Sequence, residues 1–192
     1  HPEVRDGSGV FHLLQGADTN GFAYMYPRNF IAPHGRVFGF DGNGQMYYVD
    51  TSGSGSVTSA GQFTGPMGSG SSPAMFRPGR ILQVSGSSNG ALVIDITGGA
   101  PVVTATGSLS SKRNLVTATI LADGRVLATG GSQVHNEMTG VNYNAEIWDP
   151  STGAWTLGAS EDRARLYHST ALLLPDATVL VAGGGAPGPQ IN

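Results

Sequence analysis

A tyrosine and a histidine that are adjacent in the sequence, Tyr167 and His168, are the residues whose types most directly suggest chemistry. They follow two arginines, Arg163 and Arg165, and precede the strongly apolar stretch 170–174. At the start of a strand the backbone is not yet held in the alternating pleat, so a phenol and an imidazole there can both reach one ion. Such a pair is also common as simple packing, so spacing alone leaves ligation and packing as alternatives.

A second candidate is His135, which stands beside Asn136 in the polar stretch 133–143. This stretch has turn-forming residues and no helix or strand period, so we expect a long loop inserted between two strands. Loops at the face of a fold carry a large share of binding residues. We therefore expect His135 and Asn136 to line a pocket. The other histidines are expected at terminal, solvated and turn positions: His1, His12 and His34.

The elements that carry these residues follow a repeat: an apolar strand, a tight turn, a second strand and a glycine-rich exit. Four copies are present, at residues 30–42, 76–87, 117–132 and 170–185. The turn glycines Gly35, Gly79 and Gly124 are 44 and 45 residues apart, and Ala177 follows 53 residues later. Periods of roughly 40–50 residues with four strands each are typical of β-propeller blades.

The turns differ in their sequence chemistry. The Asp-Gly pair at Asp123 and Gly124 predicts a two-residue type I′ hairpin turn, in which both central residues have positive φ. The fourth copy has Asp176 and Ala177 instead. Alanine fits such a backbone poorly, so the type of that turn stays open.

A third strand is expected after each of the first three hairpins, at 46–50, 91–95 and 145–148. Turn residues follow at 149–153, and Trp155 then opens a fourth strand. This order of Gly-Gly, aromatic residue, turn and tryptophan is the arrangement of kelch repeats. We expect Trp148 and Trp155 to fill the space between neighbouring sheets. The Gly- and Ser-rich residues 53–72 are expected to form a long surface loop.

Composition agrees with short strands joined by tight turns. Of 192 residues, 30 are glycine and 11 proline, only 12% are charged and 39% are hydrophobic. Average usage is roughly 7% glycine and about a quarter charged residues. The net charge is −3 without a cluster of Lys and Arg, so no nucleic-acid surface is expected. No apolar run approaches the ~20 residues of a membrane span, and the chain has no cysteine for disulfides or thiolate sites.

The predicted fold is all-β: kelch-type propeller blades, about three and a half to four of a larger, seven-bladed ring. The predicted blade pieces are 1–15, 22–65, 74–107, 113–158 and 164–192. Closed rings typically take four to eight blades. Because these pieces begin and end within a blade, we expect a fragment of a longer protein, with neighbouring sequence or a partner strand covering the open edges.

One passage carries a specific resemblance. Residues 164–185, ARLYHSTALLLPDATVLVAGGG, closely resemble the copper-ligating strand of the galactose oxidase and glyoxal oxidase-like copper radical oxidases. That strand has an Arg-x-Tyr-His-Ser sequence, a Leu-Leu-Pro-Asp-Gly hairpin and a Gly-Gly-Gly exit. Residues 48–61 and 145–150 also resemble galactose oxidase, in the same order, so the resemblance extends from about Tyr24 to Gly185.

The resemblance implies a copper cofactor, with Tyr167 as the axial ligand and proton-accepting base and His168 as an equatorial ligand. Imidazole and phenolate are suitable ligands for Cu(II). Arg163 and Arg165 are then expected near the phenol. The substrates would be a small alcohol, aldehyde or carbohydrate and O₂, the product H₂O₂, and the protein secreted.

The departures from this family matter as well. Its cysteine-linked second tyrosine should lie upstream of residue 1, and its second copper histidine beyond residue 192. Two ligands are too few for a catalytic copper, so we expect this chain alone to bind copper poorly and not to be a competent oxidase. The sugar-binding arginine of galactose oxidase would fall at residues 68–71, which contain none, and this counts against a galactose-like substrate.

Two other functions stay open at this point. The chain could be part of a non-catalytic kelch propeller that binds a glycan or a protein through its loops, with Tyr167 and His168 as inherited packing. It could also be a half-propeller that completes its ring with another copy or chain. Neither nucleic acid nor a membrane is expected as a partner.

Overall fold

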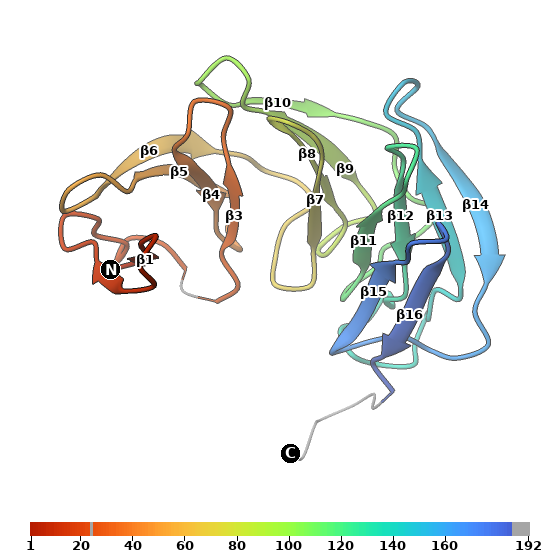
Figure 1. Cartoon of the computed structure of the whole chain (residues 1–192). Helices are drawn as coiled ribbons and strands as arrows, with labels where there is room; N and C mark the ends of the chain where they lie inside the picture. Colours follow the sequence, from red (N-terminus) through yellow and green to blue (C-terminus); the bar gives the residue numbers. More distant parts are fainter. Residues whose placement is uncertain (24, 186–192) are drawn as a thin grey trace.

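The computed structural model describes residues 1–23 and 25–185, which form sixteen β-strands and no helix. The strands make three four-stranded and two two-stranded antiparallel sheets, side by side along an arc (Figure 1). The all-β propeller expectation is confirmed. With no helix among the described residues, none could cross a membrane. Tyr24, where the resemblance begins, and residues 186–192, the end of the predicted piece 164–192, lie outside the described residues.

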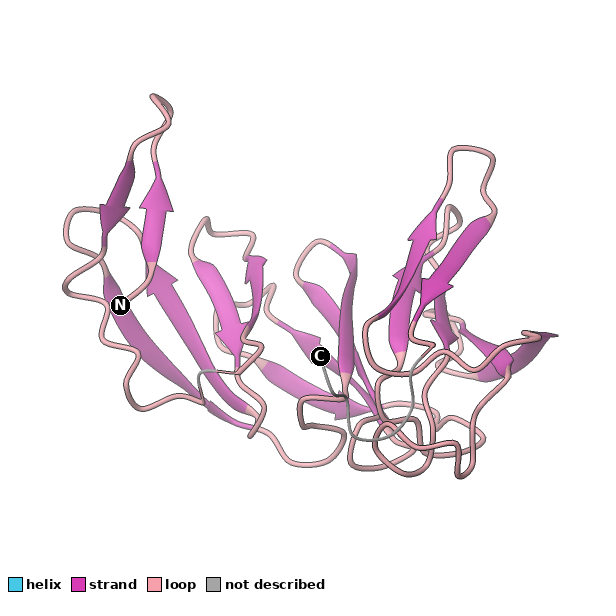
Figure 2. Ribbon diagram, turned by 90° about the horizontal axis from the view of Figure 1, so that it is seen from below, coloured by secondary structure: helices cyan, strands magenta, loops and turns pink. Residues whose placement is uncertain are grey.

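Each four-stranded sheet follows the chain from the inside of the arc to the outside (Figures 1 and 2). The first contains β3 (Arg28–Ile31), β4 (Val37–Phe40), β5 (Gln45–Asp50) and β6 (Ser56–Gln62). The second contains β7 (Ser72–Arg77), β8 (Arg80–Val84), β9 (Ala91–Asp95) and β10 (Val102–Ala105). The third contains β11 (Thr117–Ile120), β12 (Val126–Thr129), β13 (Asn144–Trp148) and β14 (Trp155–Ser160).

Two-stranded sheets stand at the two ends of the arc. They are β1 (Glu3–Arg5) with β2 (Phe11–Leu13), and β15 (Ser169–Leu173) with β16 (Val179–Gly183). The division into five blade pieces, the kelch type of the blades and a seven-bladed ring remain proposals.

The hydrophobic cores lie between neighbouring sheets rather than within them. Phe38 of β4 packs in one cluster with Ile81 and Ile94 of the next sheet. In the following interface Phe76 meets Trp148 edge-on, with ring centroids 4.9 Å apart. In the middle strand β8, residues 81–84 are all buried, whereas β10 on the outside is exposed along its whole length.

Both tryptophans fill the space between sheets, as expected. Trp148 is 2% exposed, and its Nε1 donates to Thr106 Oγ1 over 3.1 Å. The Nε1 of Trp155 donates to the Gly107 carbonyl over 2.8 Å. Both acceptors follow β10 of the preceding sheet, so each indole joins two sheets through an apolar contact and a hydrogen bond.

The predicted type I′ turn is wrong. Gly124 has φ 86°, but Asp123 is not in the positive-φ region. Gly124 N donates to Leu121 O over 3.0 Å, and Leu121 N donates to Arg125 O over 2.8 Å, which makes a three-residue loop with one left-handed residue at its end. Three-residue loops that end in a left-handed residue are, after the two-residue type I′ and II′ turns, among the commonest hairpin connections, and Asp-Gly suits both kinds.

The same loop occurs in two other hairpins. Gly35 N donates to Ala32 O over 2.8 Å, and Ala177 N donates to Leu174 O over 3.0 Å. The question left open by the sequence is thereby answered, since Ala177 adopts φ 66° where the other copies have glycine.

The expectation of a continuous loop over residues 53–72 is also wrong. Ser56–Gln62 form β6, which pairs with β5 and is the outermost strand of its sheet. Most of its side chains are exposed on both faces, so small polar residues are tolerated and no apolar alternation marks it as a strand. The loop expected at residues 133–143 does lie between β12 and β13.

Candidate functional site

The segments that precede the innermost strands surround a cavity of about 590 Å³. Its walls come from residues 25–26, 69–71, 115–117 and 166–169, with residues 135–137 of the loop between β12 and β13. Since every sheet begins with its innermost strand, these segments meet at one face of the arc. The cavity therefore lies where the repeat brings its equivalent positions together.

One wall residue from each repeat occupies the same place in that repeat. In each repeat this residue lies nine positions before the last residue of the hairpin loop. The four residues are Tyr26, Gly70, Leu115 and His168. The three that are not glycine have φ values of 52°, 65° and 62° respectively. Left-handed backbone costs an L-residue about 1–2 kcal/mol. Its recurrence at three of the four equivalent positions indicates that the chain turns sharply before these inner strands, whereas Gly70 is not in the positive-φ region.

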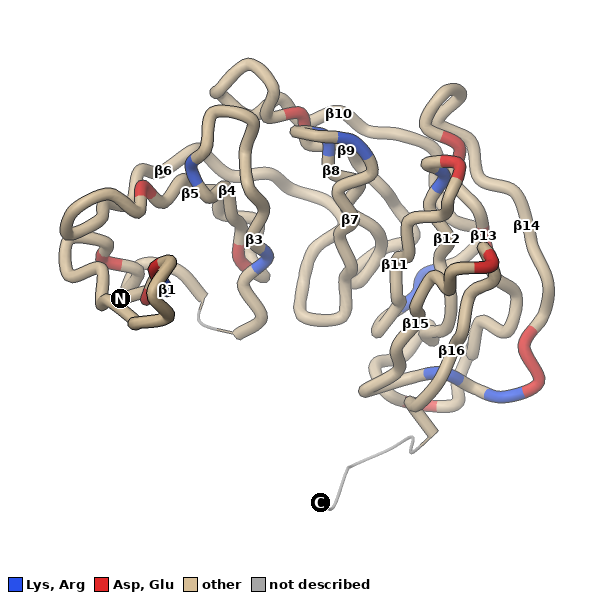
Figure 3. Tube along the Cα trace, in the orientation of Figure 1, with Lys and Arg blue, Asp and Glu red and all other residues tan. Residues whose placement is uncertain are grey.

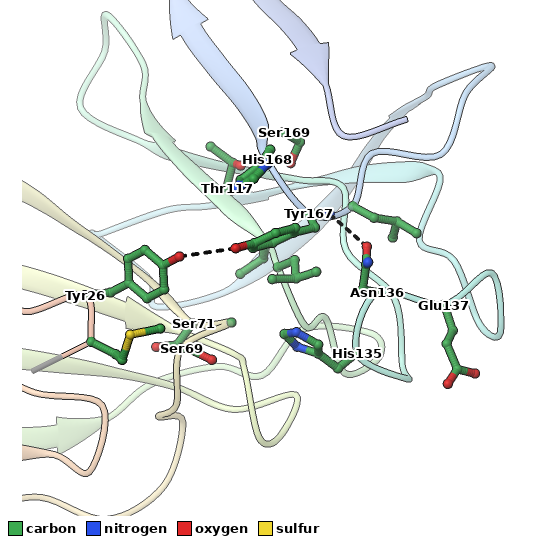
Figure 4. A pocket seen from close by; sticks show the side chains of 15 residues that line it. Tyr26, Ser69, Ser71, Thr117, His135, Asn136, Glu137, Tyr167, His168 and Ser169 are labelled. Carbon is green, nitrogen blue, oxygen red and sulfur yellow. Dashed lines mark hydrogen bonds between the residues drawn. The ribbon is translucent and has the colours of Figure 1, made fainter. Parts of the chain in front are cut away.

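Tyr167 and His168 both lie on the wall of this cavity (Figure 4). Their rings stack with centroids 3.8 Å apart and an interplanar angle of 26°. Consecutive side chains of a strand point to opposite faces, but His168 is left-handed and β15 begins only at Ser169. This backbone geometry lets a phenol and an imidazole from adjacent residues project to the same side.

Neighbouring loops hold this pair from two directions. Asn136, which is 8% exposed, accepts a hydrogen bond from Tyr167 N on its Oδ1 over 3.3 Å. His135 lines the cavity beside it, whereas Figure 4 shows the carboxylate of Glu137 pointing away. The structure thus places His135 and Asn136 on the same cavity as Tyr167 and His168.

A tyrosine from the other end of the arc, Tyr26, completes the cluster, and the sequence analysis did not identify it. Its phenolic oxygen lies 3.3 Å from that of Tyr167, within hydrogen-bond distance. This hydrogen bond, and then the charge that Tyr26 acquires when it ionises, raise the pKa of the Tyr167 phenol. Tyr26 could have been found from the repeat, because it occupies the position equivalent to His168.

The two predicted arginine neighbours do not line the cavity. Arg165 Nη1 donates to the Gly183 carbonyl over 2.9 Å, and its Nε lies 3.7 Å from Glu161. Burial raises the pKa of that Glu161 carboxyl. Arg163 is exposed and absent from the cavity wall. Among the described residues nothing is hydrogen-bonded to the His168 ring, which lies face-on against Tyr167 and open to solvent.

The donor set fits part of a copper site. A phenol oxygen and an imidazole nitrogen from adjacent residues suit Cu(II). Within 1–23 and 25–185 no three His, Cys, Asp or Glu side chains lie together to hold a metal. Tyr167 and His168 can therefore supply two ligands of such a site.

The described part of the cavity wall carries no lysine or arginine. Its lining includes serines, Thr117 and apolar residues such as Met25 and Leu166. Across the molecule, basic residues are scattered over the sheets rather than gathered on one face (Figure 3). The cavity thus offers hydrogen-bonding groups and apolar surface, without a cation that would pair with an anionic ligand.

A second cavity, of about 620 Å³, lies near the N-terminal hairpin. Its wall includes His1, Phe22 and Tyr47. Tyr47 donates its hydroxyl to Asn29 Oδ1 over 3.0 Å, and burial raises the pKa of this phenol. No adjacent phenol and imidazole occur here, so this cavity is the weaker candidate for chemistry.

Comparison with known proteins confirms the resemblance. The chain is 30% identical over 174 residues to galactose oxidase of Gibberella zeae, covering 80% of this chain and 26% of that protein. It thus spans about a quarter of the length of the curated relatives it matches. No protein-family model matches it.

Solved structures agree on the fold. A fungal alcohol oxidase of the AA5 family, solved in complex with copper, superposes with a TM-score of 0.85 at 26% identity, over 97% of this chain and 44% of that chain. The structure of YjhT superposes with a TM-score of 0.51 at 16% identity, over 60% of this chain and 34% of that one. The second likeness shows the fold alone.

Proposed function

We propose that this chain is the central part of a copper radical oxidase that oxidises a primary alcohol or an aldehyde and reduces O₂ to H₂O₂. The observation that carries the proposal is the stacked pair of Tyr167 and His168 on the cavity wall, in a chain similar to galactose oxidase. Oxidation of an alcohol to an aldehyde releases two electrons and two protons, which O₂ takes up as H₂O₂. Secretion is proposed with this activity.

Tyr167 and His168 would hold the copper in this proposal. When bound, copper with a second one-electron centre would supply the acceptor for the two electrons. His168 would bind through a ring nitrogen, for which its exposed, left-handed position leaves room. Arg163 and Arg165 have no proposed part, because neither reaches the cavity.

The proposed role of Tyr167 is to accept the hydroxyl proton of the substrate. A positioned base of this kind contributes about 10²–10⁴-fold to a rate. The phenol points into the cavity toward Tyr26 (Figure 4). Asn136 fixes the backbone that carries the phenol.

The substrate proposed is a neutral alcohol or aldehyde. Apart from the proposed copper, the described part of the wall has no lysine or arginine. A carboxylate elsewhere on the substrate would therefore be unpaired, and burying an unpaired charge is costly. Residues 69–71 line the wall where an arginine would be needed for a galactose-like ligand. Serines at this position leave space and weak hydrogen-bonding groups instead.

The test is copper loading of the complete protein, followed by measurement of bound copper and of alcohol-dependent H₂O₂. We expect about one copper per protein and more H₂O₂ from neutral primary alcohols than from hydroxy acids of the same chain length. A complete protein that binds no copper under these conditions would favour the alternative, a non-catalytic propeller that binds a glycan or protein.

A further inference from the structure

A buried arginine lies behind the cavity wall. Arg28 of β3 is 9% exposed, and its Nη1 donates to the carbonyl of Tyr26 over 2.9 Å. Its Nη2 donates to the carbonyls of Gly68 over 3.0 Å and Ser71 over 3.1 Å, and lies 3.3 Å from that of Ser69. The same Nη2 also donates to the hydroxyl of Ser71 over 3.2 Å. All these acceptors belong to the protein, so the guanidinium stabilises the cavity wall.

The segments that Arg28 joins come from different sheets. Tyr26 stands just before β3, and residues 68–71 stand just before β7. The second segment is joined in turn to the third sheet, since Leu115 N donates to Gly70 O over 2.8 Å. The planar guanidinium of arginine is suited to joining these segments, because its N–H groups have a fixed geometry and can donate to several carbonyls at once.

The side chain of Tyr26 extends from this fixed backbone across the cavity to Tyr167. The two phenolic oxygens lie 3.3 Å apart, although one residue precedes the first inner strand and the other precedes the last. Tyr26 is 52% exposed, so it contributes little to the core. Its placement is explained by the contact it makes at its tip and by the backbone that Arg28 holds.

We propose that Tyr26 is a positioning residue for Tyr167 and that Arg28 fixes Tyr26 in place. This inference rests on the proposed function, in which Tyr167 accepts the substrate proton. In the copper-free protein without the second phenol, the Tyr167 ring is held on one face by His168, but no described side chain is hydrogen-bonded to its oxygen. A misplacement of about 1 Å can lower a rate by about 10²-fold.

The first test needs no activity. Tyrosines of the complete, copper-free protein are labelled with 3-fluorotyrosine, and the Tyr167 fluorine signal is assigned from its loss in Tyr167→Phe. Tyr26→Phe, which keeps the ring and removes only the hydroxyl, should shift or broaden the Tyr167 signal. The control Tyr143→Phe, away from the cavity, should leave it unchanged. A Tyr167 signal that is identical in the wild type and in Tyr26→Phe overturns the proposal.

The second test measures copper and kinetics of the same variants. Tyr26→Phe should keep its copper, and kcat should fall by about tenfold or more while KM changes little. Unchanged kcat overturns the positioning role. If Tyr26→Phe moves the fluorine signal but the wild-type protein neither binds copper nor oxidises alcohols, the proposed function fails while the contact stands.

The role of Arg28 is tested by replacement and rescue. Arg28→Lys keeps a charge but cannot reach the same carbonyls together, so it should reproduce the Tyr26→Phe effects on the Tyr167 signal. Arg28→Gly should recover part of the wild-type signal when guanidinium at millimolar concentration fills the space. A wild-type Tyr167 signal in Arg28→Lys would overturn this part of the proposal. So would a folded Arg28→Gly protein whose Tyr167 signal does not change when guanidinium is added.

Discussion

The phenolic oxygens of Tyr26 and Tyr167 lie 3.3 Å apart, although the residues are separated by 141 positions in the sequence. Tyr26 precedes β3 of the first four-stranded sheet and Tyr167 precedes β15 of the last hairpin, so segments far apart in the sequence meet in this contact (Figure 4). The candidate site is therefore a product of the arc as a whole.

Substitution of the two proposed ligands should separate copper binding from turnover. His168→Ala in the complete protein should remove copper and activity together, since it deletes a ligand. Tyr167→Phe should keep most of the copper and lower turnover by about 10²–10⁴-fold, because the proton acceptor is lost. Metal analysis and initial rates measure both. Full copper content in His168→Ala would show that this histidine is not a ligand.

Replacing the left-handed alanine in the hairpin of the last repeat by glycine should stabilise the protein. Ala177 has φ 66°, which costs an L-residue about 1–2 kcal/mol, so Ala177→Gly should raise the free energy of unfolding by about 1 kcal/mol. Gly124→Ala is the matched reverse change: no atom lies within 4 Å of the added Cβ, so only the backbone is strained. It should cost about as much. Denaturant unfolding measures both, and equal stability of all three proteins would contradict this account.

Arg113 and Glu146 form a buried ion pair, and removing one of the two charges should strongly destabilise the protein. Arg113 Nη2 lies 2.8 Å from Glu146 Oε1, with side chains 1% and 3% exposed. Arg113→Met leaves a buried carboxylate without its cation, although Ser110 still donates two hydrogen bonds to it, and should cost about 3–5 kcal/mol. Adding Glu146→Leu should recover much of this loss.

A more exposed ion pair, Arg80 with Asp95, serves as the control. Arg80 lies 2.9 Å from Asp95, with side chains 49% and 26% exposed. Arg80→Met should cost less than about 1 kcal/mol. Unfolding curves that give the same loss for Arg80→Met and Arg113→Met would contradict the role of burial.

Acid should lower the free energy of unfolding, because it protonates aspartates that accept hydrogen bonds in turns. At Asp95, hydrogen bonds from the Thr97 hydroxyl and backbone N–H hold the pKa of the carboxyl below its usual 3.8. A carboxyl with a lowered folded pKa stabilises the protein above its unfolded pKa, and this contribution is lost as pH falls through the folded value. The free energy of unfolding should thus decline as pH drops below about 4.

Asp95→Asn isolates this effect. It should reduce the loss of stability between pH 5 and pH 2.5, because one titrating group is removed. Asp162→Asn is the control, at an exposed position where no hydrogen bond to the side chain occurs in the described part of the chain. If Asp95→Asn and wild type lose stability equally over this range, the turn hydrogen bonds do not couple stability to pH.

The sequence by itself determined the hairpins and the sheets they form. Each inner hairpin has its turn residue at a regular distance and apolar residues on both sides, and these are local signals that need no knowledge of the neighbours. Trp148 could be assigned between sheets for the same reason, because a large apolar residue in a buried strand must meet another sheet. The Tyr-His-Ser passage also identified the two candidate ligands directly.

Other features depended on the surroundings of a strand or turn. Ser56–Gln62 were expected in a loop because an outermost strand, solvated on both faces, needs no apolar pattern. The Asp-Gly turn could be assigned to the wrong type because the pair suits two kinds of loop and only strand register selects between them.

The site itself was decided by tertiary structure. That Tyr167 and His168 project to one side follows from the left-handed backbone of His168, which sequence does not display and which surrounding contacts must hold against its cost. Arg165 contacts Gly183 and Glu161 instead of the cavity, and these partners are brought to it by the fold. Tyr26 joined the site only because curvature of the arc brings the first and last inner strands to the same face, a relation that no local pattern encodes.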